Sequence, residues 1–577
     1  MSLESAPARP TAAWDVLIPE QPVAPAWTAG EPNLRLAPRR ESRLARVAVW
    51  LAAPALLAGL GAWGLQRHGA YSGDESATRW AALLPIHDLF HLLRHIDAVH
   101  GLYYLGMHAW VAFGTGPVAL RLPSLIAAVA TAGLVSELGR RLTGRLCVGL
   151  VAGIFYAINP FVMFYAQTAR SYSAVSLLIA AATLALLRAL EAARADRPGR
   201  VLLRRWATYG ALIAASGWLN EMALLVVAAH AVTMAVTGYA PRVRRQWFAA
   251  AAAGILSVIP LFVISSGQQD AVDWVTRPSG HDVVTLLRDF FGPRPAIMVV
   301  TIGCVIAGCV PAGHVRTALA NHRALAAWRR RGPASLVSVA LPLLLVPPVM
   351  LIAESEVGQP LYVDRYLLYC VLGAVLLIAH GAVRVAGRTL GQQRAAWVWL
   401  PALGLAGAVF LAQLPAARYI RSPDSRLRDF GSPATYLDRH ARPGDGVLFF
   451  SDYFRLMELG YPGAFRHIRD VGVAESPLQS GTFKGVDAPF VTAVPRILGC
   501  HRIWTVGRMP FGPQPTALDD DERALLAADF HVVRVLPFHG LTVSLWEHRA
   551  LHPRPRATRA RRIGPTRAHR DAEGAAV

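Results

Sequence analysis

An acidic pair, Asp74-Glu75, follows the first long apolar stretch of the chain, roughly residues 46–66. Carboxylates at the mouth of a membrane span are costly to desolvate, so they are more often functional than incidental. An ionised carboxylate can accept the proton of an attacking hydroxyl group. The simpler explanation is structural, because Ser72 or Asp74 would make a good helix N-cap. We favour a proton-accepting site over the cap alone.

Later segments bring arginines and a further aspartate to the same side of the membrane as this pair. The guanidinium group of arginine can hold a phosphate through two parallel hydrogen bonds. A base and a phosphate holder together suit the transfer of a sugar from a lipid phosphate to a hydroxyl group. The candidates are Arg79, Asp97, Arg121, Arg170 and Arg365.

Each of these arginines also has a simpler explanation. Arg79 lies about one helical turn after Glu75 and could only pair with it. Arg121 and Arg170 could extend to the membrane interface without binding a ligand. Arg365 could be an interfacial anchor beside Tyr362 and Tyr366.

The composition is that of a membrane protein. The 577 residues are 54% hydrophobic and 16% charged, against about 25% charged residues in soluble domains. The net charge of +21 would suggest nucleic-acid binding in a soluble protein. Here the arginines cluster in short loops between apolar runs, which is typical of topology signals, so no nucleic-acid partner is expected.

The apolar runs predict about eleven transmembrane helices, because a helical span needs about 20 apolar residues. The predicted spans lie near 46–66, 119–139, 146–166, 172–192, 206–220, 222–239, 246–265, 295–311, 334–353, 366–384 and 396–412. Five arginine-rich loops fall on one side if the tail before Arg46 is cytoplasmic. The acidic pair and the C-terminal region then lie outside the plasma membrane.

The first outer loop, 67–118, is expected to contain interfacial helices. Residues 87–96 mix apolar and polar side chains at helical spacing, and 102–113 are apolar but too short to span. An ordinary transmembrane helix over 102–113 is the alternative. It would place Arg140–Arg145 outside, against the charge rule.

The C-terminal region changes character and predicts a small extracytoplasmic α/β domain over 413–550. Helices are expected at 433–441 and 519–528, and strands at 446–450, 501–506 and, as a pair around His539-Gly540, 532–545. The ends of the chain, 1–45 and 551–577, are expected to be disordered. Whether 413–550 binds substrate stays open.

Several motifs in the membrane part, 46–412, together resemble the GT-C glycosyltransferases of family 39, the protein O-mannosyltransferase type, to which the lipid A aminoarabinose transferase is related. Each motif is weak alone, but their order and sidedness are fairly specific. They are Asp74-Glu75, Phe113-Gly114, Ala119-Leu120-Arg121-Leu122-Pro123-Ser124, Gly139–Arg145, Asn159-Pro160, Ala169-Arg170-Ser171-Tyr172 and Asp364-Arg365-Tyr366-Leu367-Leu368.

The resemblance implies an inverting transfer of a sugar, with mannose as first guess, from a polyprenyl phosphate to an acceptor hydroxyl on the outer face of a bacterial plasma membrane. It implies that Asp74 is the general base and that Glu75 helps to hold the acceptor. Donor or substrate binding falls to Arg79, Asp97, Arg121, Arg170, Tyr172, Arg365 and Tyr366. Asp97 lacks the proline-containing motif that often follows this position in the family.

No cofactor and no catalytic metal are expected from this resemblance. His87, His91, His95 and His100 have no carboxylate that completes a clear metal site. The acceptor could be a protein, a glycan or a glycolipid. The rival hypothesis is a transporter of lipid-linked sugars, although transporters tend to show internal repeats and binding groups near the bilayer midplane.

Overall fold

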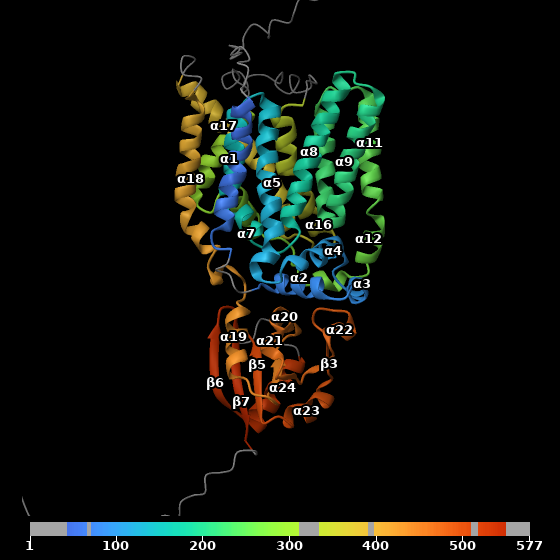
Figure 1. Cartoon of the computed structure of the whole chain (residues 1–577), viewed down its shortest axis with the longest axis vertical. Helices are drawn as coiled ribbons and strands as arrows, with labels where there is room; N and C mark the ends of the chain where they lie inside the picture. The colour runs from blue at the N-terminus through green and yellow to red at the C-terminus, as the bar shows by residue number, and fades with distance from the viewer. Residues whose placement is uncertain (1–42, 66–70, 311–333, 391–396, 509–516, 550–577) are drawn as a thin grey trace, which may run out of the picture.

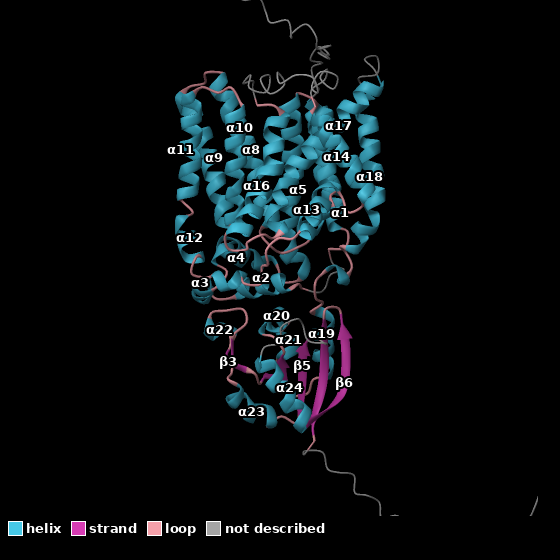
Figure 2. Cartoon of the chain, turned by 180° about the vertical axis from the view of Figure 1, so that it is seen from behind, coloured by secondary structure: helices cyan, strands magenta, loops and turns pink. Residues whose placement is uncertain are grey.

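The computed structural model describes residues 43–65, 71–310, 334–390, 397–508 and 517–549. Long helices form an upright bundle, short helices lie across one end of it, and a mixed α/β domain follows beyond them (Figure 1). Strands occur only in that domain among the described residues (Figure 2). The predicted ends 1–42 and 550–577 lie outside the described residues.

The helices of the bundle coincide with the predicted spans, except α13 (Gly280–Phe291), which lies between the spans predicted near 246–265 and 295–311. They are α1 (Arg43–Ala62), α5 (Pro117–Thr143), α6 (Leu146–Ile158), α7 (Pro160–Ala166), α8 (Tyr172–Arg194), α9 (Gly199–Leu219), α10 (Leu225–Val236), α11 (Pro241–Leu256), α12 (Ile259–Ser265), α13 (Gly280–Phe291), α14 (Pro295–Cys309), α16 (Leu336–Val357), α17 (Val371–Leu390) and α18 (Trp399–Tyr419). Six of the described helices are long and apolar enough to cross a membrane, or up to eight if two bent pairs count as one span each. A multi-span membrane protein is thus confirmed, while the count of eleven stays a prediction.

One predicted span, near 146–166, is broken at Asn159-Pro160, and a second sharp bend precedes the predicted span near 295–311. Helices α6 and α7 meet at 64°, and α13 and α14 at 70°. Pro160 cannot continue α6, and the Asn159 side chain accepts a hydrogen bond from the Val162 amide (3.0 Å) to start α7. This bend directs the chain into the turn formed by residues 167–171.

The outer loop contains three short helices: α2 (Gly73–Leu83), α3 (Ile86–His95) and α4 (Gly101–Trp110). Helices α3 and α4 lie where two were predicted, over 87–96 and 102–113, whereas α2 was considered only as the helix that Ser72 or Asp74 would cap. All three lie at the end of the bundle next to the C-terminal domain (Figure 1). Helix α4 has 10 residues and is too short to span a membrane, so the alternative of a transmembrane helix over 102–113 is wrong. Helix α5 starts beside them and ends at Thr143, which places Arg140 and Arg141 at the opposite end.

The C-terminal domain has a five-stranded sheet of order β2-β1-β5-β7-β6. Strands β1 and β5 are parallel, with Gly446 opposite Ile503, and β7 is antiparallel to β5 and β6. The strands are β1 (Gly446–Phe449), β2 (Arg469–Asp470), β3 (Val473–Glu475), β4 (Val486–Asp487), β5 (Arg502–Gly507), β6 (Phe530–Phe538) and β7 (Leu541–His548). The helices are α19 (Gly431–His440), α20 (Arg455–Gly460), α21 (Pro462–Phe465), α22 (Pro477–Ser480), α23 (Phe490–Leu498) and α24 (Ala517–Asp529). Each helix and strand predicted for this domain is therefore confirmed.

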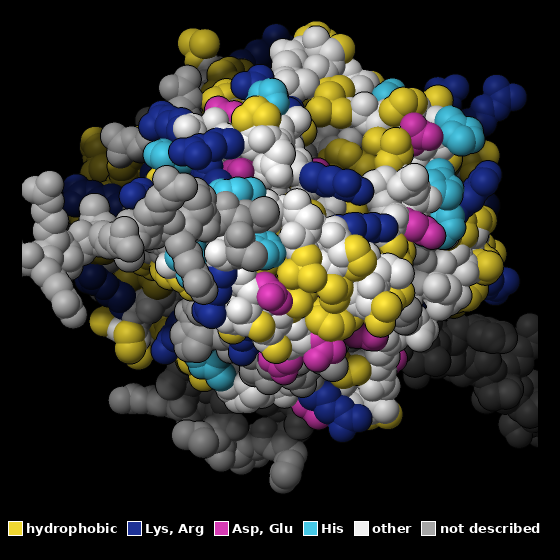
Figure 3. Space-filling view, turned by 90° about the horizontal axis from the view of Figure 1, so that it is seen from below, with side chains coloured by type: hydrophobic (Ala, Val, Ile, Leu, Met, Phe, Trp, Pro, Cys, Tyr) yellow, Lys and Arg dark blue, Asp and Glu magenta, His cyan; other side chains and the backbone are white. Residues whose placement is uncertain are grey.

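Exposed side chains differ between the bundle and the domain. The bundle exposes large apolar side chains such as Val263, Val299 and Leu411, each more than 60% accessible, as expected against lipid. The end of the molecule seen from below shows basic, acidic and histidine side chains mixed with hydrophobic ones (Figure 3). That mixture is typical of a surface that faces water.

Helix α2 lies between the bundle and α20 of the C-terminal domain. The Tyr71 amide donates a hydrogen bond to the Tyr461 hydroxyl (2.7 Å). Gly73 and Gly460 permit the close approach, because a Cβ at either position would clash with Tyr453 or Ser76. The domain is therefore packed directly on the helix that carries the acidic pair.

Candidate functional site

The acidic pair lies in the first turn of α2, which begins with a capping box. The Ser72 hydroxyl accepts from the Glu75 amide (3.3 Å), and the Glu75 carboxylate accepts from the Ser72 amide (3.1 Å). Carboxylates in the first turn also interact favourably with the helix dipole. The segment does cap its helix, but the cap accounts for only one of the hydrogen bonds that the Glu75 carboxylate accepts.

Glu75 forms a buried ion pair with Arg121 of α5. Arg121 donates from Nε to Oε1 (2.8 Å) and from Nη2 to Oε2 (2.9 Å), and both side chains are 0% exposed. The Ala169 amide donates a further hydrogen bond to Oε1 (3.1 Å). Burial acts to raise the pKa of Glu75, but Arg121 and these hydrogen bonds outweigh it and hold the pKa well below its usual range.

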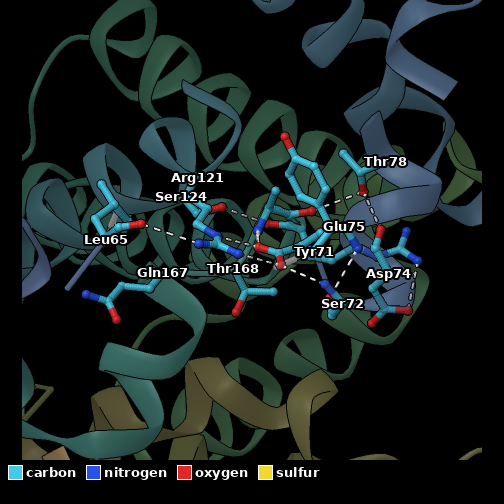
Figure 4. Close-up of polar contacts among 12 residues, drawn as sticks. Leu65, Tyr71, Ser72, Asp74, Glu75, Thr78, Arg121, Ser124, Gln167 and Thr168 are labelled. Atoms are coloured by element: carbon cyan, nitrogen blue, oxygen red, sulfur yellow. Dashed lines mark hydrogen bonds and ion pairs between the residues drawn. The ribbon is translucent and has the colours of Figure 1, made fainter. Parts of the chain in front are cut away.

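This buried ion pair differs from the substrate-facing positions that we expected for Glu75 and Arg121. We expected Glu75 to hold the acceptor and Arg121 to bind substrate, yet neither side chain has an exposed surface. Arg121 also donates to the Leu65 carbonyl (3.3 Å), which fixes it to the end of the first span. Figure 4 shows the Glu75 carboxylate directed at Arg121, with Asp74 on the other side of the helix start.

Asp74 belongs to a second and more open cluster. Arg170 donates from Nη2 to Asp74 Oδ1 (3.2 Å) and from Nη1 to Asp97 Oδ2 (3.4 Å), so it bridges two aspartates. The Asp74 side chain is 43% exposed and Asp97 18%, whereas Arg170 is only 7% exposed. Tyr104 accepts from Arg170 (2.6 Å) and donates to Asp97.

Charges nearby keep Asp74 ionised. Burial acts to raise the pKa of Asp74, but Arg170 and Arg365 outweigh it and lower the pKa from 3.8 to about 2. The same balance, with His100 and Arg170 as the opposing charges, lowers the pKa of Asp97. Burial lowers the pKa of His100 to about 4, so His100 is charged only in the acidic range where Asp97 titrates and is neutral at pH 7.

Arg365 lies beside this cluster and is surrounded by aromatic rings. Its Nε donates to the Tyr172 hydroxyl (2.9 Å), and its guanidinium lies 5.4 Å from the Trp274 ring centroid and 5.8 Å from that of Tyr366. Arg170 is buried and bridges two aspartates, whereas Arg365 is partly exposed and donates to a neutral hydroxyl. Its charge is therefore available to an anion.

Arg79 belongs to neither ion-paired cluster. Glu75 pairs with Arg121, so the simpler explanation of Arg79 as only a partner of Glu75 is wrong. Arg79 instead interacts with the Tyr71 hydroxyl. The remaining predicted residues, Asp97, Tyr172 and Tyr366, do lie with Asp74, Arg170 and Arg365.

Sequence reasoning missed Tyr104 and Arg426. Arg426 lies 258 positions after Thr168, yet it donates to the Thr168 hydroxyl (2.9 Å). Only the basic linker after the last span could have drawn attention to it. Among the described residues, no group of three or more His, Cys, Asp or Glu side chains could hold a metal ion.

Comparisons with known proteins give structural matches alone: no family model and no curated protein matches the chain. The chain is similar to ArnT from Cupriavidus metallidurans in the apo state, at 12% identity and a TM-score of 0.48, over 86% of this chain and 96% of that one. The same protein bound to undecaprenyl phosphate gives 12% identity, a TM-score of 0.48, and coverage of 87% and 96%. An oligosaccharyltransferase from Archaeoglobus fulgidus gives 13% identity and a TM-score of 0.47, over 79% and 67%.

The aminoarabinose transferase named by the sequence resemblance is thus among the structural matches. At identities of 12–13% and TM-scores below 0.5, these matches concern the backbone fold and do not assign roles to residues. The roles of single residues rest on the contacts described above.

Proposed function

We propose that this protein is a membrane glycosyltransferase that moves a sugar from a polyprenyl phosphate to an acceptor hydroxyl at the outer face of the membrane. One observation carries the proposal. Asp74, a half-exposed ionised carboxylate, is held by Arg170 and lies near the partly exposed Arg365, at the end of the spans where a lipid-linked donor would meet water.

Asp74 accepts the proton of the acceptor hydroxyl as its oxygen attacks the anomeric carbon of the donor sugar. The bond between that carbon and the phosphate oxygen breaks, and the polyprenyl phosphate leaves with its electron pair. Attack from the face opposite the phosphate inverts the anomeric configuration. Arg170 orients Asp74, while the resulting carboxylic acid passes its proton to water.

Arg365 stabilises the phosphate as negative charge develops on it. Its place between Trp274, Tyr172 and Tyr366 gives the cation a rigid aromatic setting. We assign Glu75 and Arg121 to holding α2 against the bundle. Because an arginine supplies the positive charge, we expect a chelator to leave the rate unchanged.

The finer assignment is a transferase of the family 39 type, with mannose as the donor sugar and a protein, glycan or glycolipid as acceptor. The test is transfer in membranes, with a panel of radiolabelled polyprenyl-phosphate sugars that starts with mannose and total envelope as acceptor. Incorporation with an inverted anomeric configuration supports the proposal. If labelled lipid crosses the membrane and no donor gives incorporation, the transferase proposal is wrong and the protein is a transporter of lipid-linked sugars.

A further inference from the structure

The linker between α18 and α19, residues 420–430, sends two buried arginines into the membrane part. Arg421 is 4% exposed and donates to the carbonyls of Trp63 (2.7 Å) and Leu60 (2.6 Å) at the end of α1. Arg426 is 5% exposed and reaches the turn formed by residues 167–171. The two arginines therefore hold different parts of the same end of the bundle.

Arg426 contacts two groups of the turn and one aromatic ring of helix α7. It donates from Nη1 to the Thr168 hydroxyl (2.9 Å) and from Nη2 to the Gln167 carbonyl (3.0 Å), and it lies over the Phe164 ring at 4.5 Å. Hydrogen bonds from a charged donor are among the stronger ones in a buried setting. Arg426 thus fixes the first two residues of the turn.

The next two residues of the turn contact the two carboxylates of α2. The Ala169 amide donates to Glu75 (3.1 Å), and the Ala169 carbonyl accepts from the Thr78 hydroxyl (3.0 Å). Arg170 then bridges Asp74 and Asp97. A shift of the turn at Thr168 would therefore move the Arg170 guanidinium away from the proposed base.

We propose that Arg426 is a positioning residue for this site, which acts through the 167–171 turn to hold Arg170 against Asp74. The proposal rests on the proposed function for its catalytic meaning. The proposal extends the proposed function, because it makes the linker to the C-terminal domain part of the site. Substitutions in that domain or linker would then change the rate of sugar transfer even though the substituted residues do not contact substrate.

A purely electrostatic role for Arg426 is the competing explanation, because its charge also interacts with Glu75. Glu75 already has a two-point pair with Arg121, and Arg426 donates its hydrogen bonds to the turn instead. The geometry therefore favours positioning over neutralisation.

The test compares three variants of the full chain in lipid nanodiscs: Arg426→Gln, Arg426→Lys and, as a matched buried arginine of the same linker, Arg421→Gln. Hydrogen–deuterium exchange is followed in the peptide that covers 166–172. We expect about tenfold faster exchange there in Arg426→Gln, as for the loss of buried charge-assisted hydrogen bonds. Arg426→Lys should recover part of the protection. Arg421 reaches the turn only through the Trp63 carbonyl, which also accepts from the Gln167 side chain (2.9 Å), so Arg421→Gln should have a clearly smaller effect on this peptide than Arg426→Gln.

The second readout is the pH profile of transfer per folded enzyme. Arg426→Gln should lower kcat and move the acidic limb to higher pH, because a displaced Arg170 no longer keeps the pKa of Asp74 low. Unchanged exchange in Arg426→Gln, or an equal effect of Arg421→Gln, would overturn the proposal. If the wild type transfers no sugar, the exchange result still decides whether Arg426 holds the turn, and only the proposed function fails.

Discussion

The two sides of helix α2 place adjacent carboxylates in opposite settings. On the closed side, Glu75 is 0% exposed and paired with Arg121, while on the open side Asp74 is 43% exposed and held by Arg170. Successive residues of a helix point about 100° apart, so one carboxylate can face the bundle and its neighbour the water. A motif of two acidic residues can therefore contain one structural and one chemical group.

Breaking the closed side should have the largest effect on stability. Glu75→Gln leaves the Arg121 charge buried and unpaired, which costs about 3–5 kcal/mol by analogy with other buried pairs. We expect a clear fall in the unfolding temperature of the detergent-solubilised protein and in the folded yield.

The matched control for Glu75→Gln is another pair on α5. Glu137 pairs with Arg140 at 2.8 Å, but its side chain is 14% exposed and lies at the opposite end of the helix. Glu137→Gln should cost about 1 kcal/mol or less, as partly exposed pairs usually do. Equal losses in the two variants would contradict the distinction between the closed side and an ordinary ion pair.

Substitution of Arg365 tests whether the open side of α2 binds the phosphate of the donor. Arg365→Gln keeps the hydrogen bond to Tyr172 possible but removes the positive charge. Loss of a charged hydrogen bond to the phosphate should raise the KM for the donor about tenfold or more. Initial rates over a donor series measure this, with Arg288→Gln, an exposed arginine of α13, as control. An unchanged KM would remove Arg365 from the donor site.

Changing Arg170 should have a smaller effect, seen in the pH dependence. Asp74 has a pKa lowered to about 2, so it stays ionised at neutral pH and gains a proton only as the pH falls through that value. In Arg170→Gln the pKa should return toward 3.8, helped by the nearby Asp97 charge. The acidic limb of the rate should then move up by about one pH unit or more. An unmoved limb would show that Arg170 does not set the protonation of the base.

The sequence predicts the fold well where a local pattern decides it. Apolar length placed a helix at each predicted span, and alternation with turn residues placed strands β1, β5, β6 and β7. It did not predict the bend at Asn159, because a run of apolar residues hides a proline that starts a new helix. It also missed helix α13, because residues 280–291 carry too many polar side chains to be recognised as part of a span.

The site was predicted where the order of charged residues along the chain was enough. Asp74, Asp97, Arg170 and Arg365 do lie together. Which of Asp74 and Glu75 faces the water could not be read, since that depends on the Arg121 side chain 46 residues later. Arg426 is further still from its partner, and its buried contacts arise only from tertiary packing.

The most direct test of Asp74 as the general base is sugar transfer by Asp74→Asn beside the wild type. The matched control is Asp88→Asn of helix α3, a partly exposed carboxylate outside the cluster. Membranes with equal amounts of folded protein receive a donor that the wild type uses. We predict that Asp74→Asn loses about 10²–10⁴-fold in rate, as for removal of a general base, while Asp88→Asn stays near the wild type. Transfer by well-folded Asp74→Asn at the wild-type rate would contradict the assignment of the base.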